Sequence, residues 1–257
     1  MLYFIGLGLN NEKDITINGL EAVKKCDIIY LESYTSILNC TEQQLEKFFD
    51  RKIFLASRNI VESDDNGIIR NAKTKNVAFL VFGDPLVATT HIDLFLRAKK
   101  EGIKCSVIHN SSIISAVGAT GLQVYKFGKT TSIPLENENI ETPYDALKGN
   151  LSLGLHTLFL LDFNQDEEKF LSINDAIRYL LKVQLKRNEK IFSEKTLCVG
   201  CARLGSENQI IKAGIAKDLL KFNFGKPPHC LIVPGKLHFV EEEGLKLYLP
   251  LNLNINI

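Results

Sequence analysis

The sequence has almost no excess of charge of either sign. Its 257 residues include 31 Lys and Arg against 30 Asp and Glu, which leaves a net charge of +1. Nucleic-acid-binding proteins usually carry a basic excess or stripe, so this balance disfavours a nucleic-acid partner. No apolar run reaches the roughly 18 residues of a membrane span, and we expect no membrane association. The apolar share of 45% and the charged share of 24% are typical of a globular protein.

The sequence also lacks the features of a secreted or metal-binding protein. The first residues, MLYFIGLGL, contain no basic segment, so we expect no signal peptide. Cys198 and Cys201 fall in a predicted strand, where positions three apart face opposite sides, and no partner pair lies at zinc spacing, so we predict no metal site. We therefore expect free thiols and a cytoplasmic location. The six scattered cysteines are Cys26, Cys40, Cys105, Cys198, Cys201 and Cys230.

Two familiar nucleotide-binding motifs are absent. The run GLGLNN at 6–11 has Asn11 where the dinucleotide fingerprint requires a third glycine. No G-x-x-x-x-G-K-[S/T] run occurs, which excludes a P-loop. The run at 6–11 still fits two interpretations, a strand-end turn whose backbone approaches a ligand or a plain strand-to-helix turn.

Short apolar runs alternate with helical patterns in the first half of the chain. Asp14 or Thr16 is expected to cap the first helix, and Thr41 with Gln44 predicts a capping box on the second. The β-α-β order is typical of an α/β domain with a mostly parallel sheet. The predicted strands are 2–6, 27–31, 52–56, 76–82 and 105–109, and the predicted helices are 16–25, 41–49 and 91–100.

The pattern changes after about residue 110. Residues 123–149 are rich in Thr, Pro, Asn and Glu and predict strand fragments and loops. Fewer β-α-β units follow, which predicts a second α/β domain with a mixed sheet. We place the domains at 1–112 and 113–257, with a hinge within 110–121. The later strands are predicted at 156–162, 196–202 and 230–233, and the helices at 173–185, 216–220 and 237–246.

Two further strand ends are rich in small and polar residues. The run GDPLVATT at 83–90 follows the most apolar strand, and NSSII at 110–114 follows the next one. Open α/β sheets bind ligands outside the carboxyl ends of their strands, so both runs are candidate binding loops. The alternative is structural, with Thr89 or Thr90 and the serines capping the helices that follow.

Other polar residues have mainly structural interpretations. His229 opens a strand after Pro-Pro and is expected to be a half-exposed edge residue. The glutamate run at 241–243 is expected to form a solvated helix face. The five histidines are spread too widely for a Ser-His-Asp arrangement to be argued from spacing, so we name no catalytic residue.

Taken together, the motifs resemble those of the diphthine synthases, which belong to the tetrapyrrole-methylase superfamily. The resemblance extends in order from the first residue to about Glu243. It implies two α/β domains with the cofactor in the cleft between them. The segments that carry it are LYFIGLGLNNEKDITINGLEAVKKCDIIYLESYTS, FGDPLVATTH, SSIISAVGATGLQVYKFGK, HTLFLLDF, CARLGS and PPHCLIVPGKLHFVE.

The resemblance implies methyl transfer from S-adenosylmethionine, which leaves S-adenosylhomocysteine. The implied acceptor is the histidine of elongation factor 2 that already carries a 3-amino-3-carboxypropyl group, a step of diphthamide biosynthesis. The resemblance also implies a homodimer. The cofactor-binding positions of the family correspond here to Leu9, Asp84, Val87, Ser112, Ile113, Phe163, Leu204 and His229.

Two other functions fit the same fold class. A tetrapyrrole methyltransferase acting on a uroporphyrinogen or precorrin is the nearest, but such enzymes carry a glycine-richer first loop than GLGLNN. Their polycarboxylate substrate also favours a basic cleft, and no basic run lies near the candidate loops. The second is a non-catalytic binding protein of the same fold, whose stability the cofactor would not change.

Overall fold

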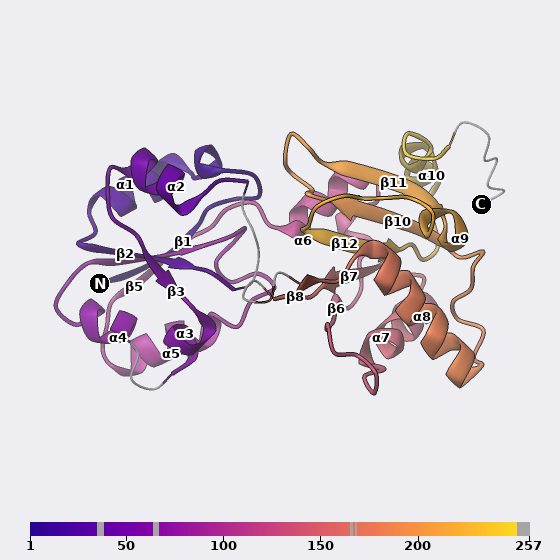
Figure 1. Ribbon diagram of the computed structural model, residues 1–257, viewed down its shortest axis with the longest axis horizontal. Helices are drawn as coiled ribbons and strands as arrows, with labels where there is room; N and C mark the ends of the chain where they lie inside the picture. The colour runs from indigo at the N-terminus through magenta and orange to yellow at the C-terminus, as the bar shows by residue number, and fades with distance from the viewer. Residues whose placement is uncertain (35–38, 64–66, 165–166, 168, 251–257) are drawn as a thin grey trace. The chain divides into compact units, whose positions relative to one another are not determined.

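The computed structural model describes residues 1–34, 39–63, 67–164, 167 and 169–250. The chain forms two compact units (Figure 1). The first contains Met1–Ile114 and Gly205–Glu207, and the second contains Ser115–Leu204 and the chain from Asn208 onward. The division predicted after residue 112 stays a prediction, because compactness does not establish which segments fold independently.

The first unit is built on a five-stranded parallel sheet in the order β3-β2-β4-β1-β5. All five residues of β4 are buried, as expected for a central strand covered on both faces. The predicted parallel α/β sheet is therefore confirmed. Its strands are β1 (Leu2–Gly6), β2 (Ile28–Glu32), β3 (Phe54–Ala56), β4 (Val77–Val81) and β5 (Cys105–Ile108).

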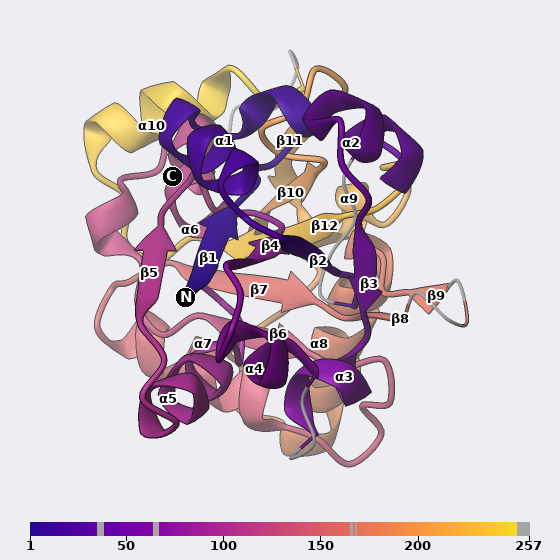
Figure 2. The ribbon, with the colours of Figure 1, turned by 90° about the vertical axis from the view of Figure 1, so that its left-hand side faces the viewer.

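Helices cover both faces of this sheet (Figures 1 and 2). On one face lie α1 (Ile17–Lys24) and α2 (Glu42–Phe49), with the short η1 (Glu12–Asp14) before α1. On the other lie α3 (Arg58–Glu62), α4 (Gly67–Ala72) and α5 (Ile92–Lys100). Strand side chains alternate between two cores, because successive residues of a strand point to opposite faces.

Some of the predicted N-cap residues agree with the first residues of the observed helices, and others do not. Thr16 caps α1, and Thr41 with Gln44 forms the predicted capping box on α2. The alternative interpretation of Thr89 or Thr90 as a helix cap is wrong, since the N-cap residue of α5 is His91 and no side chain caps this helix. The brief α3 and α4 were not predicted, because five or six residues are too few to establish a period.

The second unit contains a mixed five-stranded sheet in the order β11-β10-β12-β7-β6, which confirms the prediction. β7 runs antiparallel to β12 and parallel to β6. The strands are β6 (Thr131–Ile133), β7 (Thr157–Leu161), β10 (Leu197–Ala202), β11 (Ile210–Ile215) and β12 (His229–Val233), with a separate pair β8 (Phe163–Asn164) and β9 (Lys169–Phe170).

The helices of this half are mostly short, and α8 is the longest. They are α6 (Ile113–Ala116), which spans the division between the units, η2 (Val117–Thr120), η3 (Val124–Lys126), α7 (Thr142–Ser152), α8 (Ile173–Arg187), α9 (Ala216–Leu219) and α10 (Phe239–Lys246). No helix in the described part of the chain is long and apolar enough to span a membrane.

Residues 123–149 differ from the prediction of strand fragments and loops. β6 is present, but the helix α7 begins at Thr142 with Pro143 in its first turn. Tyr144 and Leu147 bury one face of α7, and Asn150 turns inward to bond the backbone of Lys129. A buried polar residue in the helix obscures the apolar period. β11 was also not predicted.

Candidate functional site

Three loops meet at one edge of the parallel sheet. They follow β1, β4 and β5, which are neighbours in the order β4-β1-β5. Since all five strands are parallel, their carboxyl ends lie at the same edge, where open α/β sheets bind ligands. The three runs singled out in the sequence are thus brought together. They carry five of the eight candidate residues, Leu9, Asp84, Val87, Ser112 and Ile113.

The first two loops are joined directly through their glycines. Gly8 N donates to Gly83 O at 3.2 Å, and Gly83 N donates to Gly8 O at 2.7 Å. Both glycines have positive φ, +80° and +68°, which L side chains rarely adopt. A Cβ on Gly6 would lie 2.5 Å from Gly83 O and 2.7 Å from Asn110 Cβ. The glycine positions of the incomplete fingerprint therefore permit contact between loops.

Asp84 braces the second loop against the third. Its side chain is almost fully buried, at 5% exposure. Oδ1 accepts the backbone N–H of Leu86 at 3.0 Å. Oδ2 accepts the N–H of Asn110 at 3.2 Å and lies 2.7 Å from Nδ1 of His109. The carboxylate thus orders the loops that carry Val87 and Ser112.

Asn110 and Asp14 brace the first loop, and the sequence did not reveal this role. Asn110 Nδ2 donates to the carbonyls of Gly6 at 3.0 Å and Asp14 at 2.9 Å. Asp14 Oδ2 accepts the N–H groups of Leu9 at 3.2 Å and Asn10 at 2.8 Å. The sequence indicates Asp14 only as a possible helix cap. The available signal was Asn110 shortly after the strand β5 and Asp14 shortly before the helix α1, and both placements are too common to be specific.

The remaining candidates of the first unit flank these braces. Leu9 is half-buried, and a Cβ on Gly205 would lie 2.8 Å from its side chain. Gly205 belongs to the first unit although it follows Leu204 in the chain. Ser112 is buried, and Ile113 is the first residue of α6.

The three candidates of the second unit gather near one end of the mixed sheet. His229 begins β12, opposite Ala202 at the end of β10. Leu204 lies two residues beyond Ala202 and is buried. Phe163 on β8 pairs with Phe170 on β9, and the Phe170 ring packs edge-on against His229 at 5.5 Å. Residues distant in the sequence are thus linked through one aromatic contact.

His229 is buried on a central strand, so the expectation of a half-exposed edge residue is wrong. Its Nε2 lies 3.1 Å from the carbonyl of Lys226, while Nδ1 has no partner in the described part of the chain. Burial lowers the pKa of His229, which favours the neutral ring. Because a carbonyl only accepts, Nε2 carries the hydrogen and Nδ1 is left as an unfilled acceptor.

Glu241 also differs from expectation. Its side chain is fully buried, not solvated, and it accepts hydrogen bonds from His238 N at 2.8 Å and Gln123 N at 2.9 Å. His156 Nε2 lies 2.8 Å from its Oε1, and Lys126 forms an ion pair with Oε2. Burial alone would raise the pKa of Glu241, but these bonds outweigh burial and lower it to about 2. The cluster is structural and contains none of the candidate residues.

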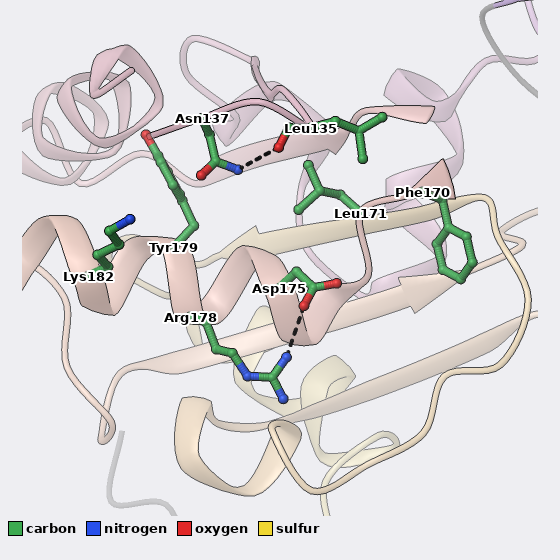
Figure 3. A pocket seen from close by; sticks show the side chains of 8 residues that line it. All are labelled: Leu135, Asn137, Phe170, Leu171, Asp175, Arg178, Tyr179 and Lys182. Carbon is green, nitrogen blue, oxygen red and sulfur yellow. Dashed lines mark hydrogen bonds and ion pairs between the residues drawn. The ribbon is translucent and has the colours of Figure 1, made fainter. Parts of the chain in front are cut away.

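A pocket of about 370 Å³ lies beside the first half of α8 (Figure 3). Several of its polar groups already have partners. Asp175 bonds to Arg178 and to Ser172, and Tyr179 Oη donates to the carbonyl of Ile140. None of the eight candidate residues lines it, so we assign it no function. Its lining is Leu135, Asn137, Phe170, Leu171, Asp175, Arg178, Tyr179 and Lys182. Among the described residues, no group of three or more His, Cys, Asp or Glu could hold a metal ion.

Comparison with known proteins identifies the class. A family model described as tetrapyrrole (corrin/porphyrin) methylases matches residues 1–220. The chain is 51% identical over 254 residues to the diphthine synthase of Methanosarcina mazei, covering 95% of this chain and 94% of that one. It is 47% identical over 271 residues to a probable diphthine methyl ester synthase of Arabidopsis thaliana, covering 96% and 98%.

The fold agrees with the sequence comparison. A crystal structure described as diphthine synthase matches with a TM-score of 0.88 at 38% identity, covering 97% of this chain and 96% of that one. Such a match, with a parallel and a mixed sheet, defines a methyltransferase of the tetrapyrrole-methylase type. Within that class, the chain belongs to the diphthine synthase family.

Proposed function

We propose that this protein transfers methyl groups from S-adenosylmethionine to the 3-amino-3-carboxypropyl-histidine of elongation factor 2, in diphthamide biosynthesis. The observation that supports this most directly is near-full-length similarity to diphthine synthases at 47–51% identity. The tetrapyrrole and non-catalytic alternatives are not favoured, because the relatives with near-full-length similarity are diphthine synthases.

We propose Leu9, Asp84, Val87, Ser112 and Ile113 of the first unit, and Phe163, Leu204 and His229 of the second, as cofactor-binding residues. The first five lie on braced loops at the carboxyl edge of a parallel sheet, the usual ligand position in such folds. In the second unit, the unfilled Nδ1 acceptor of His229 suits a donor such as the adenine amino group or a ribose hydroxyl. The residues present therefore fit the cofactor.

When bound, S-adenosylmethionine supplies an electrophilic methyl group on a positively charged sulfur. Held by the eight proposed residues, it would serve as the methyl donor to the acceptor amine. The protein's contribution is to orient the two partners in line and to exclude water. Apolar side chains such as Leu9 and Leu204 suit water exclusion, and no general base is assigned.

The decisive test is labelled methyl transfer to elongation factor 2 prepared with and without the aminocarboxypropyl group. Labelling of the modified form alone is expected. Equal labelling of both forms, or of neither, would contradict the proposed acceptor. Labelling of a uroporphyrinogen would instead support a tetrapyrrole substrate. A mass spectrum of the modified protein would count the methyl groups added.

We further propose a cytoplasmic homodimer. Sedimentation at micromolar concentration should give about twice the chain mass of 28.9 kDa. A species at the chain mass itself would contradict the dimer and leave the proposed reaction unaffected.

A further inference from the structure

The loop that carries Asp84 and Val87 contains a strained residue. Ala88 has φ of +57°, in the left-handed region that L side chains rarely adopt. Backbone strain of this kind persists only where the surroundings impose it. Ala88 directly follows Val87, so whatever holds its conformation also sets the position of a proposed cofactor contact.

Three hydrogen bonds among Pro85, Thr89 and His91 hold the two ends of the loop together. Nδ1 of His91 lies 3.2 Å from Pro85 O. Thr89 Oγ1 donates to the same carbonyl at 3.3 Å and accepts from His91 N at 3.3 Å. His91 therefore ties the end of the loop back to its beginning across Ala88.

His91 is an unusual residue for its surroundings. It is fully buried, and its ring packs edge-on against Phe79 at 5.1 Å and Tyr34 at 6.1 Å. Burial lowers its pKa to about 4, so the ring is neutral at physiological pH. Since Pro85 O can only accept, Nδ1 carries the hydrogen.

The second ring nitrogen of His91, Nε2, makes a histidine energetically unfavourable at this buried position. Nε2 has no hydrogen-bond partner among the residues that the structure describes. A buried unpaired polar atom is unfavourable, and an apolar side chain of similar size would avoid that cost. Packing alone therefore does not account for a histidine here, whereas the bond from Nδ1 to Pro85 does.

We propose that His91 is a positioning residue for methyl-donor binding, which holds the strained 84–90 loop so that Asp84 and Val87 are presented to the donor. This rests on the proposed function. His91 is not in the cofactor-binding set. It acts through the Pro85 carbonyl and the conformation of Ala88.

The test measures S-adenosylhomocysteine affinity by calorimetry in five single variants and one double variant. His91→Leu keeps volume and removes the hydrogen bond, so its Kd should rise about tenfold, as expected for one bond of typical net strength. His91→Asn places an N–H near the position of Nδ1 and should stay within about threefold of wild type. His91→Gln, which places its amide nearer Nε2, should behave like the Leu variant.

Ala88→Gly tests whether His91 acts through the conformation of Ala88 or only through packing in the core. Glycine adopts the left-handed conformation without strain, so adding it to His91→Leu should recover about fivefold in affinity. In the wild-type background it should change affinity little. A purely structural His91 would show no such coupling. Leu94→Ala, at a buried position of α5, the helix that begins after His91, is the control that should lower Tm without changing Kd.

Each outcome decides a claim. Wild-type protein that binds neither S-adenosylmethionine nor its product would overturn the proposed function itself. Wild-type binding with unchanged Kd in His91→Leu would overturn only the positioning role, as would absence of rescue by Ala88→Gly. If His91→Leu does not fold, the Asn and Gln variants provide the test. Equal affinities of His91→Asn and His91→Gln would then overturn the positioning role.

Discussion

In the first unit, the candidate residues come from three loops that follow neighbouring parallel strands, and polar side chains brace these loops to one another. In the second unit, they come from the start of β12, the segment after β10 and the small sheet of β8 and β9. One aromatic contact, between Phe170 and His229, links β9 to β12. A parallel sheet brings successive loops to one edge by topology alone. A mixed sheet does so only through pairings between distant segments.

The difference extends to buried charge. In the first unit, the Asp84 carboxylate orders candidate loops. In the second, the Glu241 carboxylate ties α10 to the Gln123 segment and to His156, away from the candidate residues. Carboxylates with similar burial thus serve a proposed site in one unit and the stability of the fold in the other.

The largest effect is expected from Glu241→Gln, which should lower the free energy of unfolding by about 3 kcal/mol, because it removes one member of a buried, hydrogen-bonded charge cluster. Urea unfolding at neutral pH measures it. Glu243→Gln, an exposed neighbour on the same helix, should change stability by less than about 0.5 kcal/mol. Equal effects of the two substitutions would contradict a special role for Glu241.

The same variant has a pH signature. The pKa of Glu241 is about 2 in the folded protein, below its ordinary value of 4.5. A lowered pKa contributes stability above the ordinary value, and this contribution is lost as pH falls toward the folded value. The stability gap between wild type and Glu241→Gln should therefore shrink from about pH 6 to about pH 2. If the difference in stability between wild type and Glu241→Gln did not change with pH, the difference would come from packing and not from the charge of Glu241.

S-adenosylmethionine should stabilise the protein by about 2.7 kcal/mol at 100 times its Kd, because a ligand bound only by the folded state must do so. Thermal unfolding with and without the cofactor checks this. Hydrogen exchange would report on each unit separately. Cofactor binding should protect the loop after β4 in the first unit and the start of β12 in the second. No thermal shift at saturation would contradict cofactor binding.

Gly6→Ala should destabilise the protein by about 2 kcal/mol, since its Cβ would meet backbone of the second loop at 2.5 Å. Gly149→Ala is the matched control in the second unit. Its Cβ would meet nothing within 4 Å, and alanine favours the helix α7 by up to about 1 kcal/mol. Chemical denaturation of both variants measures the contrast, and a tolerated Gly6→Ala would refute the close approach of the loops.

Asp84→Ala should raise the Kd for S-adenosylmethionine about tenfold while the protein stays folded, because the loops lose one shared brace. Calorimetry with circular dichroism measures both properties. Asp93→Ala, an exposed carboxylate on α5, is the control and should bind normally. An Asp84 variant that binds like wild type, or that does not fold, would reduce Asp84 to a local cap.

The strength of the local signals explains which features could be predicted. The capping box at Thr41 and Gln44 and the apolar strand at β4 are local patterns with one interpretation each, and both were found. The helix α7 was missed because Asn150 faces its core to bond Lys129, against the apolar period. His229 and Glu241 were misjudged because polar residues are usually exposed, and only distant partners make their burial favourable.

By itself, the sequence determined the five strands of the first unit, most of the longer helices, the parallel and mixed character of the two sheets and the presence of polar runs at three strand ends. These follow from periodicity and local residue preference, which act over a few positions. Only the tertiary structure decided that Gly8 meets Gly83, that Asn110 holds the loop of Asp14 and that His91 closes the loop over Ala88. Those contacts depend on strand order and register, and the chain separations of 75 and 96 residues between the first two pairs leave no local trace of them.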